Sequence, residues 1–537
     1  MKIETRPHKL SHIIVLILAM ITFGFFASSL GKELGWDLAS YHYYNPYAWL
    51  HHRRHWDYWP PSQLQAYFNP ALDFLTYFLI NQFSPRTSTF LLGAIQGINF
   101  WLLYCLSYLF LKRDFGKGTF CAAMSAAFVG YLGPVTFSET GSFQGDLVIS
   151  IFVLSAVLMW AMALECLANK KWMILSGLML GMGAGLKLTA VLFVLGFLPT
   201  FLVLTADYKE NLKWFVGWCA AVLTGFLFSN GYWMLVLWHE HGNPFFPFFN
   251  AVFHSPDFVS MNWRDTRFFP HGFLNTLFYP FYFSWNSQIS ELPFVDFRFA
   301  IVYVLLIFNV AIASMQKIVK GVKTNYSRQS ILFILFYLSS YLVWQIYFSN
   351  VRYLVSLEML SPLMIILLIH QIIKNASIRL VMVAFIFIFL IYTVKPLLMI
   401  DRLPKFGDNY FGVTLPKFVV NIEQALVLTP YSDYVLTPLP KPQNYLIPFF
   451  PAQWRFVGIP FQFDQYYLPG KVKGLVQSFQ GNVYLLTTQA TLPALYRAAH
   501  ELGYEQYNQC EKIISDRQKL PHLKDDDVLI CSVRKIN

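Results

Sequence analysis

The chain has 537 residues, of which 56% are hydrophobic, 18% aromatic and only 13% charged. This composition leaves too little polar surface to cover a water-soluble globule of this size, so it excludes a soluble enzyme or regulatory domain. The net charge of +11 does not indicate a nucleic-acid-binding protein, because the basic residues gather in short loops between apolar segments. The sequence therefore predicts an all-α polytopic membrane protein.

Apolar segments of roughly 17 to 25 residues recur through residues 1–400, and each is long enough to cross a hydrocarbon layer of about 30 Å. The first follows a basic N-terminus and has no clear small-residue cleavage site, so it is read as a retained helix. We expect about eleven transmembrane helices, near residues 12–30, 87–111, 119–135, 147–168, 173–186, 188–205, 214–233, 296–316, 330–348, 353–373 and 380–400.

Charge in the loops predicts the orientation. With the N-terminus in the cytoplasm, the lysine-rich and arginine-rich loops also fall there, and an odd number of crossings places the C-terminus outside. Residues 69–83 are apolar but short. Counting them as a crossing would place most of the later basic loops outside the cytoplasm, so we expect a helix in the membrane interface. Residues 173–205 are rich in glycine and contain Lys187, which predicts two short helices meeting near that lysine.

Two long external loops follow, residues 31–86 and 234–295, both rich in aromatic residues suited to the headgroup region. From residue 401 the pattern changes to short alternating segments, DYVLTP, VYLLTT and DVLICSVRKI, with a helical stretch at ATLPALYRAAHELGY. Residues 401–537 therefore predict a small extracytoplasmic α/β domain with a structural or acceptor-docking role. Cys510 and Cys531 are candidates for a disulfide if this domain lies outside the cytoplasm.

Ionisable residues near the membrane are costly, so each is a candidate functional residue. In the predicted topology the following all fall on the external side: Asp37, Asp57, Glu139, Asp146, Lys187, Glu240, Arg264, Asp265, Arg267, Glu291 and Arg352. The cytoplasmic loops carry only ordinary anchoring charge. The sequence therefore predicts that the chemistry takes place on the external face.

Two carboxylates and two cations are the strongest candidates. Asp37 and Asp146 are predicted catalytic residues, one as general base and the other orienting the acceptor or holding a divalent cation such as Mg²⁺ or Mn²⁺. Helix capping is the plain alternative for Asp146. Lys187 and Arg352 suit a phosphate, the alternatives being snorkelling of Lys187 and an ion pair of Arg352 with Glu358.

The loops add weaker candidates. Arg264 and Arg267 either grip phosphates or form an internal salt bridge with Asp265. His42 belongs to a group with His51, His52 and His55 that either binds a metal or contacts headgroups, although the HHRRH spacing fits no known ligand pattern. The candidates for acceptor or sugar binding are His42, Tyr43 and Glu240.

The chain resembles the GT-C superfamily of membrane glycosyltransferases, in particular bacterial mannosyl- and aminoarabinose-transferases. The resemblance covers about residues 10–400 and depends on WDLASYHYY after the first span, FQGDLVIS before the fourth, the lysine of GLKLTA, and the Arg352–Tyr353 pair. It implies a GT-C fold in which Asp37 is the catalytic base, while Lys187, Arg352 and Tyr353 hold the lipid phosphate. Many members carry two adjacent acids after the first span, whereas Trp36 and Leu38 flank Asp37 here.

The resemblance implies an inverting transferase in a bacterial inner membrane. Its partners would be a polyprenyl-phosphate-linked sugar, a lipid or glycan acceptor and membrane lipids, with no nucleic acid. Two other functions remain open from the sequence: a lipid-linked glycan polymerase or ligase, and a lipid or glycan transporter. A transporter would distribute polar residues through the bilayer midplane and on both sides.

Overall fold

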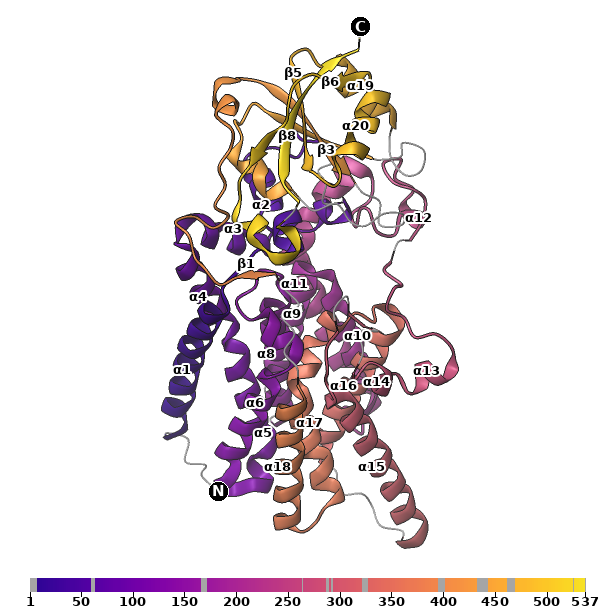
Figure 1. Cartoon of the computed structure of the whole chain (residues 1–537). Coiled ribbons are helices and arrows are strands. Elements are labelled where there is room, and N and C mark those ends of the chain that lie inside the picture. The colour runs from indigo at the N-terminus through magenta and orange to yellow at the C-terminus, as the bar shows by residue number, and fades with distance from the viewer. Residues whose placement is uncertain are drawn as a thin grey trace.

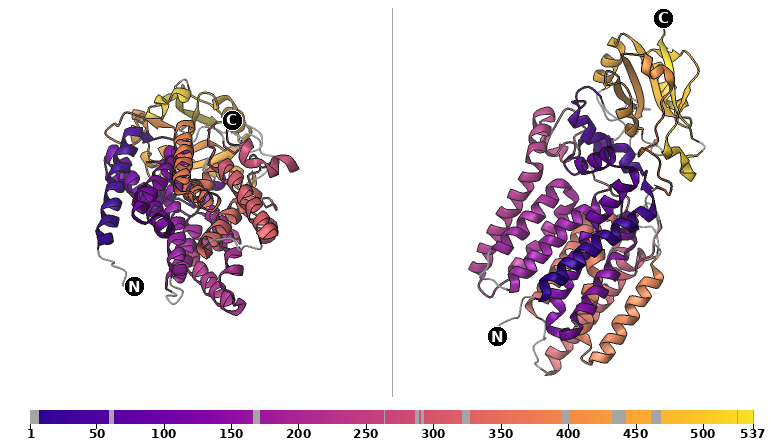
Figure 2. Two further views of the ribbon diagram at one scale, coloured as in Figure 1. Left: turned by 90° about the horizontal axis from the view of Figure 1, so that it is seen from below. Right: turned by 90° about the vertical axis from the view of Figure 1, so that its left-hand side faces the viewer.

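A bundle of long helices carries a layer of β-structure at one end (Figure 1). The computed structural model describes residues 7–58, 63–165, 171–262, 264–285, 289–290, 293–320, 327–394, 401–431, 443–460, 469–524 and 526–536. The N-terminus lies at the end of the bundle away from the β-layer, and the C-terminus lies in that layer (Figures 1 and 2). The expected placement of the two termini on opposite sides of a membrane stays a prediction.

The bundle is built from helices that follow the apolar segments of the sequence. They are α1 (Pro7–Leu30), α4 (Pro85–Gln96), α5 (Ile98–Phe115), α6 (Thr119–Tyr131), α8 (Asp146–Glu165), α9 (Lys171–Leu186), α10 (Val191–Phe197), α11 (Tyr208–His241), α15 (Arg298–Lys320), α16 (Arg328–Tyr347), α17 (Val355–Ile372) and α18 (Ala376–Thr393). Within the described residues, seven helical stretches are long and apolar enough to cross a membrane, one of which is the 47-residue run Pro85–Tyr131. The chain is thus a helical membrane protein, and the eleven crossings stay a prediction.

Burial separates the inner helices from the outer ones. Every residue of α17 from Val355 to Ile369 is buried, which makes this helix the centre of the bundle. On α18, by contrast, Leu380, Val381 and Phe385 are each at least 66% exposed. A wide apolar surface of this kind is unstable in water, so we assign it to contact with lipid.

Small residues bring α9 and α11 close together. A Cβ added at Gly181 would lie 2.0 Å from the carbonyl oxygen of Val222, and one added at Gly225 would lie 2.2 Å from that of Leu178. Such close backbone approach is typical of helices packed in membranes. Helix α9 ends at Leu186 and Lys187 is extended, with φ −144° and ψ 110°, which confirms the predicted break at this lysine.

The loop after α1 forms a cap on the bundle. It contains β1 (Lys32–Glu33), the π-helical turn η1 (Leu38–His42), α2 (Tyr44–Leu50), η2 (Gln63–Tyr67) and α3 (Asp73–Gln82). Helix α3 has only ten residues and is not among the candidate spans, as expected for an interface helix. Short helices also follow α6 and α11: α7 (Pro134–Glu139), α12 (Asn250–Phe253), α13 (Phe273–Leu277) and α14 (Tyr279–Tyr282).

The C-terminal layer is a mixed sheet of six strands. Its elements are β3 (Ala425–Tyr431), β4 (Arg455–Pro460), α19 (Pro469–Ser478), β5 (Asn482–Thr488), α20 (Leu492–Glu501), β6 (Tyr504–Gln506), β7 (Glu511–Ile513) and β8 (Val528–Lys535). The strand order is β4-β3-β5-β8-β6, with β7 also on β8; β3 is parallel to β4 and β5, and β8 is antiparallel to β5. The predicted strands at VYLLTT and DVLICSVRKI and the helix between them are confirmed, whereas DYVLTP lies outside the described residues.

The two faces of this sheet belong to two different cores. Alternate residues such as Leu426, Leu428 and Leu485 pack with α19 and α20. The intervening residues, such as Val427 and Tyr484, pack with the cap loop, where Leu38, Tyr43, Tyr44 and Tyr47 share their core with Tyr410, Phe411 and Trp454. The alternation follows from the two-residue period of a strand. The C-terminal layer is therefore packed onto residues 31–86 rather than isolated from them.

Buried ion pairs fix this packing. Arg53 forms a two-point pair with Asp57 at 2.7 and 2.8 Å and also donates to the carbonyl of Trp454 at 2.6 Å, while Asp57 accepts the backbone N–H of Phe456. Both charged side chains are at least 96% inaccessible. Such planar pairing is directional, so it sets the cap loop in register against the edge strand β4.

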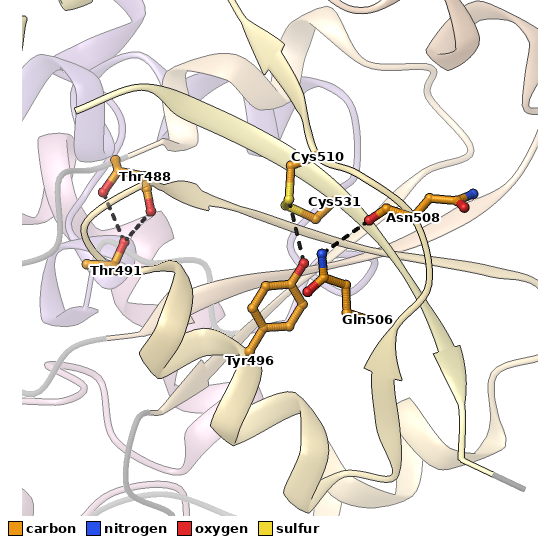
Figure 3. The surroundings of a disulfide bond; sticks show 7 residues. All are labelled: Thr488, Thr491, Tyr496, Gln506, Asn508, Cys510 and Cys531. Atoms are coloured by element: carbon orange, nitrogen blue, oxygen red, sulfur yellow. Dashed lines mark hydrogen bonds between the residues drawn. A yellow bond between two sulfur atoms is a disulfide. The ribbon is translucent and has the colours of Figure 1, made fainter. Parts of the chain in front are cut away.

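A disulfide joins Cys510 to Cys531 on β8, as the sequence indicated (Figure 3). The hydroxyl of Tyr496, on α20, points toward Cys510 Sγ at 3.5 Å. The bond closes a 21-residue separation and fastens the segment between β6 and β7 to the sheet.

The carboxyl group of Glu33 makes folding sensitive to pH. It is fully buried and accepts the backbone N–H of Phe143, and burial raises its pKa from 4.5 to about 7. Between pH 4.5 and about pH 7, Glu33 is therefore protonated in the folded state and ionised in the unfolded state. We expect its contribution to stability to be complete below pH 4.5 and to fall by about 3 kcal/mol as the pH rises through 7.

Glu33→Gln should remove this decline, because the amide carries no charge to bury. Thermal unfolding in detergent between pH 5 and pH 8.5 measures it, with the exposed Glu423→Gln as matched control. A Glu33→Gln protein that loses as much stability as the wild type over this range would contradict the assignment.

Candidate functional site

Four charged side chains from distant parts of the chain meet where the bundle joins the cap loop. They are Asp37 after β1, Asp146 at the start of α8, Lys187 between α9 and α10, and Arg352 just before α17. The first and last are 315 residues apart in sequence, yet Arg352 Nη1 donates to Asp37 Oδ2 at 2.8 Å. Both predicted catalytic residues and two of the predicted phosphate-binding residues, Lys187 and Arg352, are thus brought into one cluster, which we call the charged cluster.

Local structure presents each carboxylate to the cluster. Asp37 precedes the π-helical turn and its side chain does not cap that helix, so it is free to point elsewhere. Asp146 is the first residue of α8 and follows Gly145, whose φ of +85° is a conformation that favours glycine. A Cβ at Gly145 would also lie 2.7 Å from Leu72, so both the turn and the cap loop require glycine here.

Arg352 is the centre of the cluster. Its Nε and Nη2 donate to Asp146 Oδ2 at 3.2 and 3.1 Å, and its Nη1 donates to Asp37. The turn Val351–Leu354 begins with Asn350, whose side chain accepts the backbone N–H of Arg352 and so fixes the direction of the arginine. The guanidinium group therefore joins two carboxylates that the sequence separates by 109 positions.

Lys187 reaches the cluster because the helix breaks at this residue. Its Nζ lies 2.5 Å from Asp146 Oδ1 and donates to the carbonyl of Gln144 at 3.2 Å. It also lies 6.0 Å from the centre of the Tyr353 ring, the other predicted phosphate-binding residue. Lys187 is thus paired with an acid and does not snorkel to a surface.

Glu139, at the end of α7, is a third acid in the cluster that was not chosen as a site residue. Arg352 Nε lies 3.5 Å from Glu139 Oε1, too far for a hydrogen bond, and neither oxygen has a hydrogen-bond partner in the described part of the chain. Burial, and then the charge of Asp146, raises the pKa of Glu139 well above its usual value. Burial therefore favours the protonated form of Glu139, whereas Asp37 and Asp146 are each paired with a cation.

The members of the cluster differ in how open they are. The side chains of Arg352, Lys187 and Asp37 are 22%, 18% and 15% exposed, whereas that of Asp146 is only 5% exposed. The first three can be reached by a ligand without unfolding the loop. Asp146 instead contacts both cations from the more buried side of the cluster, and its catalytic role stays a prediction.

His42 also lies beside the cluster, but its surroundings are not those of a sugar-binding side chain. It is buried, and its Nδ1 lies 2.6 Å from Asp73 Oδ1 on α3. Burial raises the pKa of Asp73, and Asp37 and Lys187 are close enough to act on it electrostatically. Asp73 was missed because NPALDFLTYF reads as an apolar interface helix, in which one acid at the helix start looks like ordinary capping.

The remaining candidates lie elsewhere or have other partners. Tyr43 is buried against Phe411 and donates to Asn81 Oδ1 at 3.0 Å, and Glu240 pairs with Arg54 at 2.5 Å. These contacts help to hold the cap loop in place, and the expected role of the two residues in acceptor binding stays a prediction.

The arginines of the second loop are placed by local contacts. Arg267 pairs with Asp265 at 2.7 Å, the salt bridge that the sequence left open, and Arg264 stacks on Phe269. Asp265 is within electrostatic range of Tyr353, so this loop still approaches the cluster.

Asp37 and Asp146 are not arranged as a divalent metal site in this structure. The guanidinium group of Arg352 occupies the position between Asp37 and Asp146 that a bridging cation would take. In the described part of the chain, no group of three or more His, Cys, Asp or Glu residues has metal-binding geometry. His42, His51 and His55 have separate partners, namely Asp73, Tyr77 and Glu240. We derive no step through a metal.

Comparison with protein-family models, with curated proteins and with solved structures finds no match to this chain. The charged cluster is therefore the main indication of its function.

Proposed function

We propose that this protein is a membrane glycosyltransferase that moves a sugar from a polyprenyl-phosphate donor to a hydroxyl group of a lipid or glycan acceptor. One observation carries the proposal: Asp37, Lys187 and Arg352 converge, partly exposed, where an apolar helix bundle meets an aromatic cap loop. A lipid-linked phosphate needs this combination, because its chain stays in the bilayer while its charge requires cations at the membrane boundary. The GT-C resemblance of the sequence implies the same reaction.

The residues divide the reaction between them. Asp37 takes the proton of the acceptor hydroxyl as that oxygen bonds to the anomeric carbon, and the bond from this carbon to the phosphate oxygen breaks on the opposite face. The electron pair leaves with the lipid phosphate, toward Arg352 and Lys187. Attack opposite to the leaving group inverts the anomeric centre. An ionised phosphate is a stable leaving group, so no general acid is needed.

The cations are available for the phosphate because their present partners are exchangeable. Arg352 and Lys187 are neutralised by Asp37 and Asp146, and a phosphate can replace Asp37 at the exposed Nη1 of Arg352. That exchange would release Asp37 from its ion pair and so make it a stronger base at the moment when the donor is bound.

The reaction is proposed for the external face of a bacterial inner membrane. The positive-inside pattern of the loops supports this side, as does the disulfide between Cys510 and Cys531, since disulfides persist in oxidising compartments. The C-terminal layer then covers the cap loop from outside. It is in a position to guide the acceptor toward Asp37.

The test is a transfer assay with purified protein in lipid. Candidate polyprenyl-phosphate sugars are supplied with lipid acceptors, and release of free polyprenyl phosphate is followed together with the glycosylated product. We expect stoichiometric release of the lipid phosphate. Release of a lipid diphosphate from diphosphate-linked glycans would instead identify the polymerase or ligase, and movement of the lipid across the bilayer with no bond broken would identify the transporter.

A further inference from the structure

One ring nitrogen of a buried histidine is left without a partner beside the charged cluster. His42 and Asp73 are 4% and 3% exposed, and Nδ1 of His42 lies 2.6 Å from Asp73 Oδ1. The other nitrogen, Nε2, has no hydrogen-bond partner within the described residues. Buried polar atoms are nearly always paired, so an unpaired one beside a reactive cluster indicates a function.

His42 is the last residue of the π-helical turn that directly follows Asp37. In an α-helix, five residues span about 1.4 turns, so residues 37 and 42 would point to different sides. Here the backbone N–H of Tyr43 donates to the carbonyl of Leu38 at 3.4 Å, the five-residue spacing of a π-turn. Asp37 also acts electrostatically on Asp73, the carboxylate paired with His42, so Asp37 and the His42–Asp73 pair lie in one neighbourhood.

Asp73 orients the imidazole as a proton acceptor. An ionised Asp73 accepts the hydrogen of Nδ1, which leaves the lone pair on Nε2. The carboxylate also stabilises the imidazolium form that results when Nε2 takes a proton. The same arrangement activates histidine bases in many enzymes.

We propose that His42, held by Asp73, is the proton store of this site and receives the proton that Asp37 takes from the acceptor. The inference depends on the proposed function. In the transfer step the acceptor O–H bond breaks and its proton passes to the Asp37 carboxylate. The proton then moves to His42 Nε2, which restores the Asp37 anion, and it leaves to water before the next cycle.

Other charged groups around the pair set its proton affinity. The buried Glu33 on β1 interacts with His42, and both Asp37 and Lys187 act on Asp73. The ring of Tyr41 lies 4.1 Å from that of His42, and both side chains are buried. Because His42 lies deeper than Asp37, a proton stored there is protected from exchange until the acceptor has reacted.

The first test requires no substrate. Full-length protein labelled with ¹⁵N-histidine is titrated in detergent, and the His42 signal is assigned by its loss in His42→Gln. We expect a hydrogen on Nδ1 and a change of the Nε2 signal with pH that differs in Asp37→Asn, because a negative charge is removed from the neighbourhood. A His42 signal that does not change with pH, or that changes in the same way in Asp37→Asn, overturns the inference.

The second test uses the transfer assay. His42→Gln should lower kcat by about 10- to 100-fold with the KM for the donor unchanged. Imidazole should restore turnover to His42→Ala, a result that a structural role would not produce. The exposed His500→Gln is the matched control.

The two possible failures can be told apart. Wild-type kcat in His42→Gln overturns the proton store while leaving the transferase intact. If the wild type itself releases no lipid phosphate, the proposed function fails, and the titration still decides whether His42 and Asp37 are coupled.

Discussion

Replacing Asp37 with asparagine should lower sugar transfer by about a thousandfold or more while leaving folded protein in the membrane. Asparagine keeps the size of the side chain and can still accept a hydrogen bond from Arg352, so the cap loop should stay in place. It cannot take a proton from a hydroxyl group. The measurement is the rate of release of polyprenyl phosphate by purified protein in lipid, compared with the wild type at equal concentration of folded protein.

The control for this variant is Asp408→Asn, which changes an exposed acid of the C-terminal layer in the same way. It should transfer sugar at the wild-type rate. Substantial turnover in Asp37→Asn, with an unchanged pH profile, would show that another group is the base.

Replacing Arg352 with glutamine should have the largest combined effect on stability and activity. The guanidinium group holds Asp37 and Asp146 together. Without it, two carboxylates that are at most 15% exposed lose a cationic partner. Removing one partner of a buried ion pair typically costs about 3–5 kcal/mol. We therefore expect a marked fall in the unfolding temperature in detergent together with loss of transfer.

A double variant separates these two effects. Arg352→Gln combined with Asp37→Asn should recover part of the lost stability, because one unpaired charge is gone, but it should remain inactive. Arg352→Lys keeps a charge but cannot contact both carboxylates at once, so it should fold better than Arg352→Gln and bind the donor weakly. Wild-type stability in Arg352→Gln would contradict the central position of this arginine.

The long apolar elements were predictable because their signal is local. Helices α1 and α8 begin and end within five residues of the predicted segments, whereas α18 begins four residues before its segment and ends at Thr393, close to undescribed residues. The break at Lys187 was also visible, since a charge next to a run of glycines does not suit the middle of a membrane helix. The hydrophobic period of β5 and β8 likewise indicated strands.

The candidate site was predictable only in part. Asp37, Asp146, Lys187 and Arg352 could be chosen because ionisable groups at a membrane boundary are costly. Asp73 and Glu139 could not be singled out from the sequence, because their proximity to the charged cluster depends on how distant segments pack. The contacts of Tyr43 with Phe411 and of Glu240 with Arg54 could not be predicted either, because they join segments far apart in the sequence.

The sequence by itself determined that this chain is a helical membrane protein and which of its residues carry charge into the membrane boundary. Hydropathy and the cost of burying charge act residue by residue, so both can be read from the order of amino acids. The tertiary structure alone decided that Arg352 lies between Asp37 and Asp146, that Lys187 pairs with Asp146, and that His42 pairs with Asp73. Such contacts depend on distances between segments hundreds of residues apart, which only packing of the whole chain fixes.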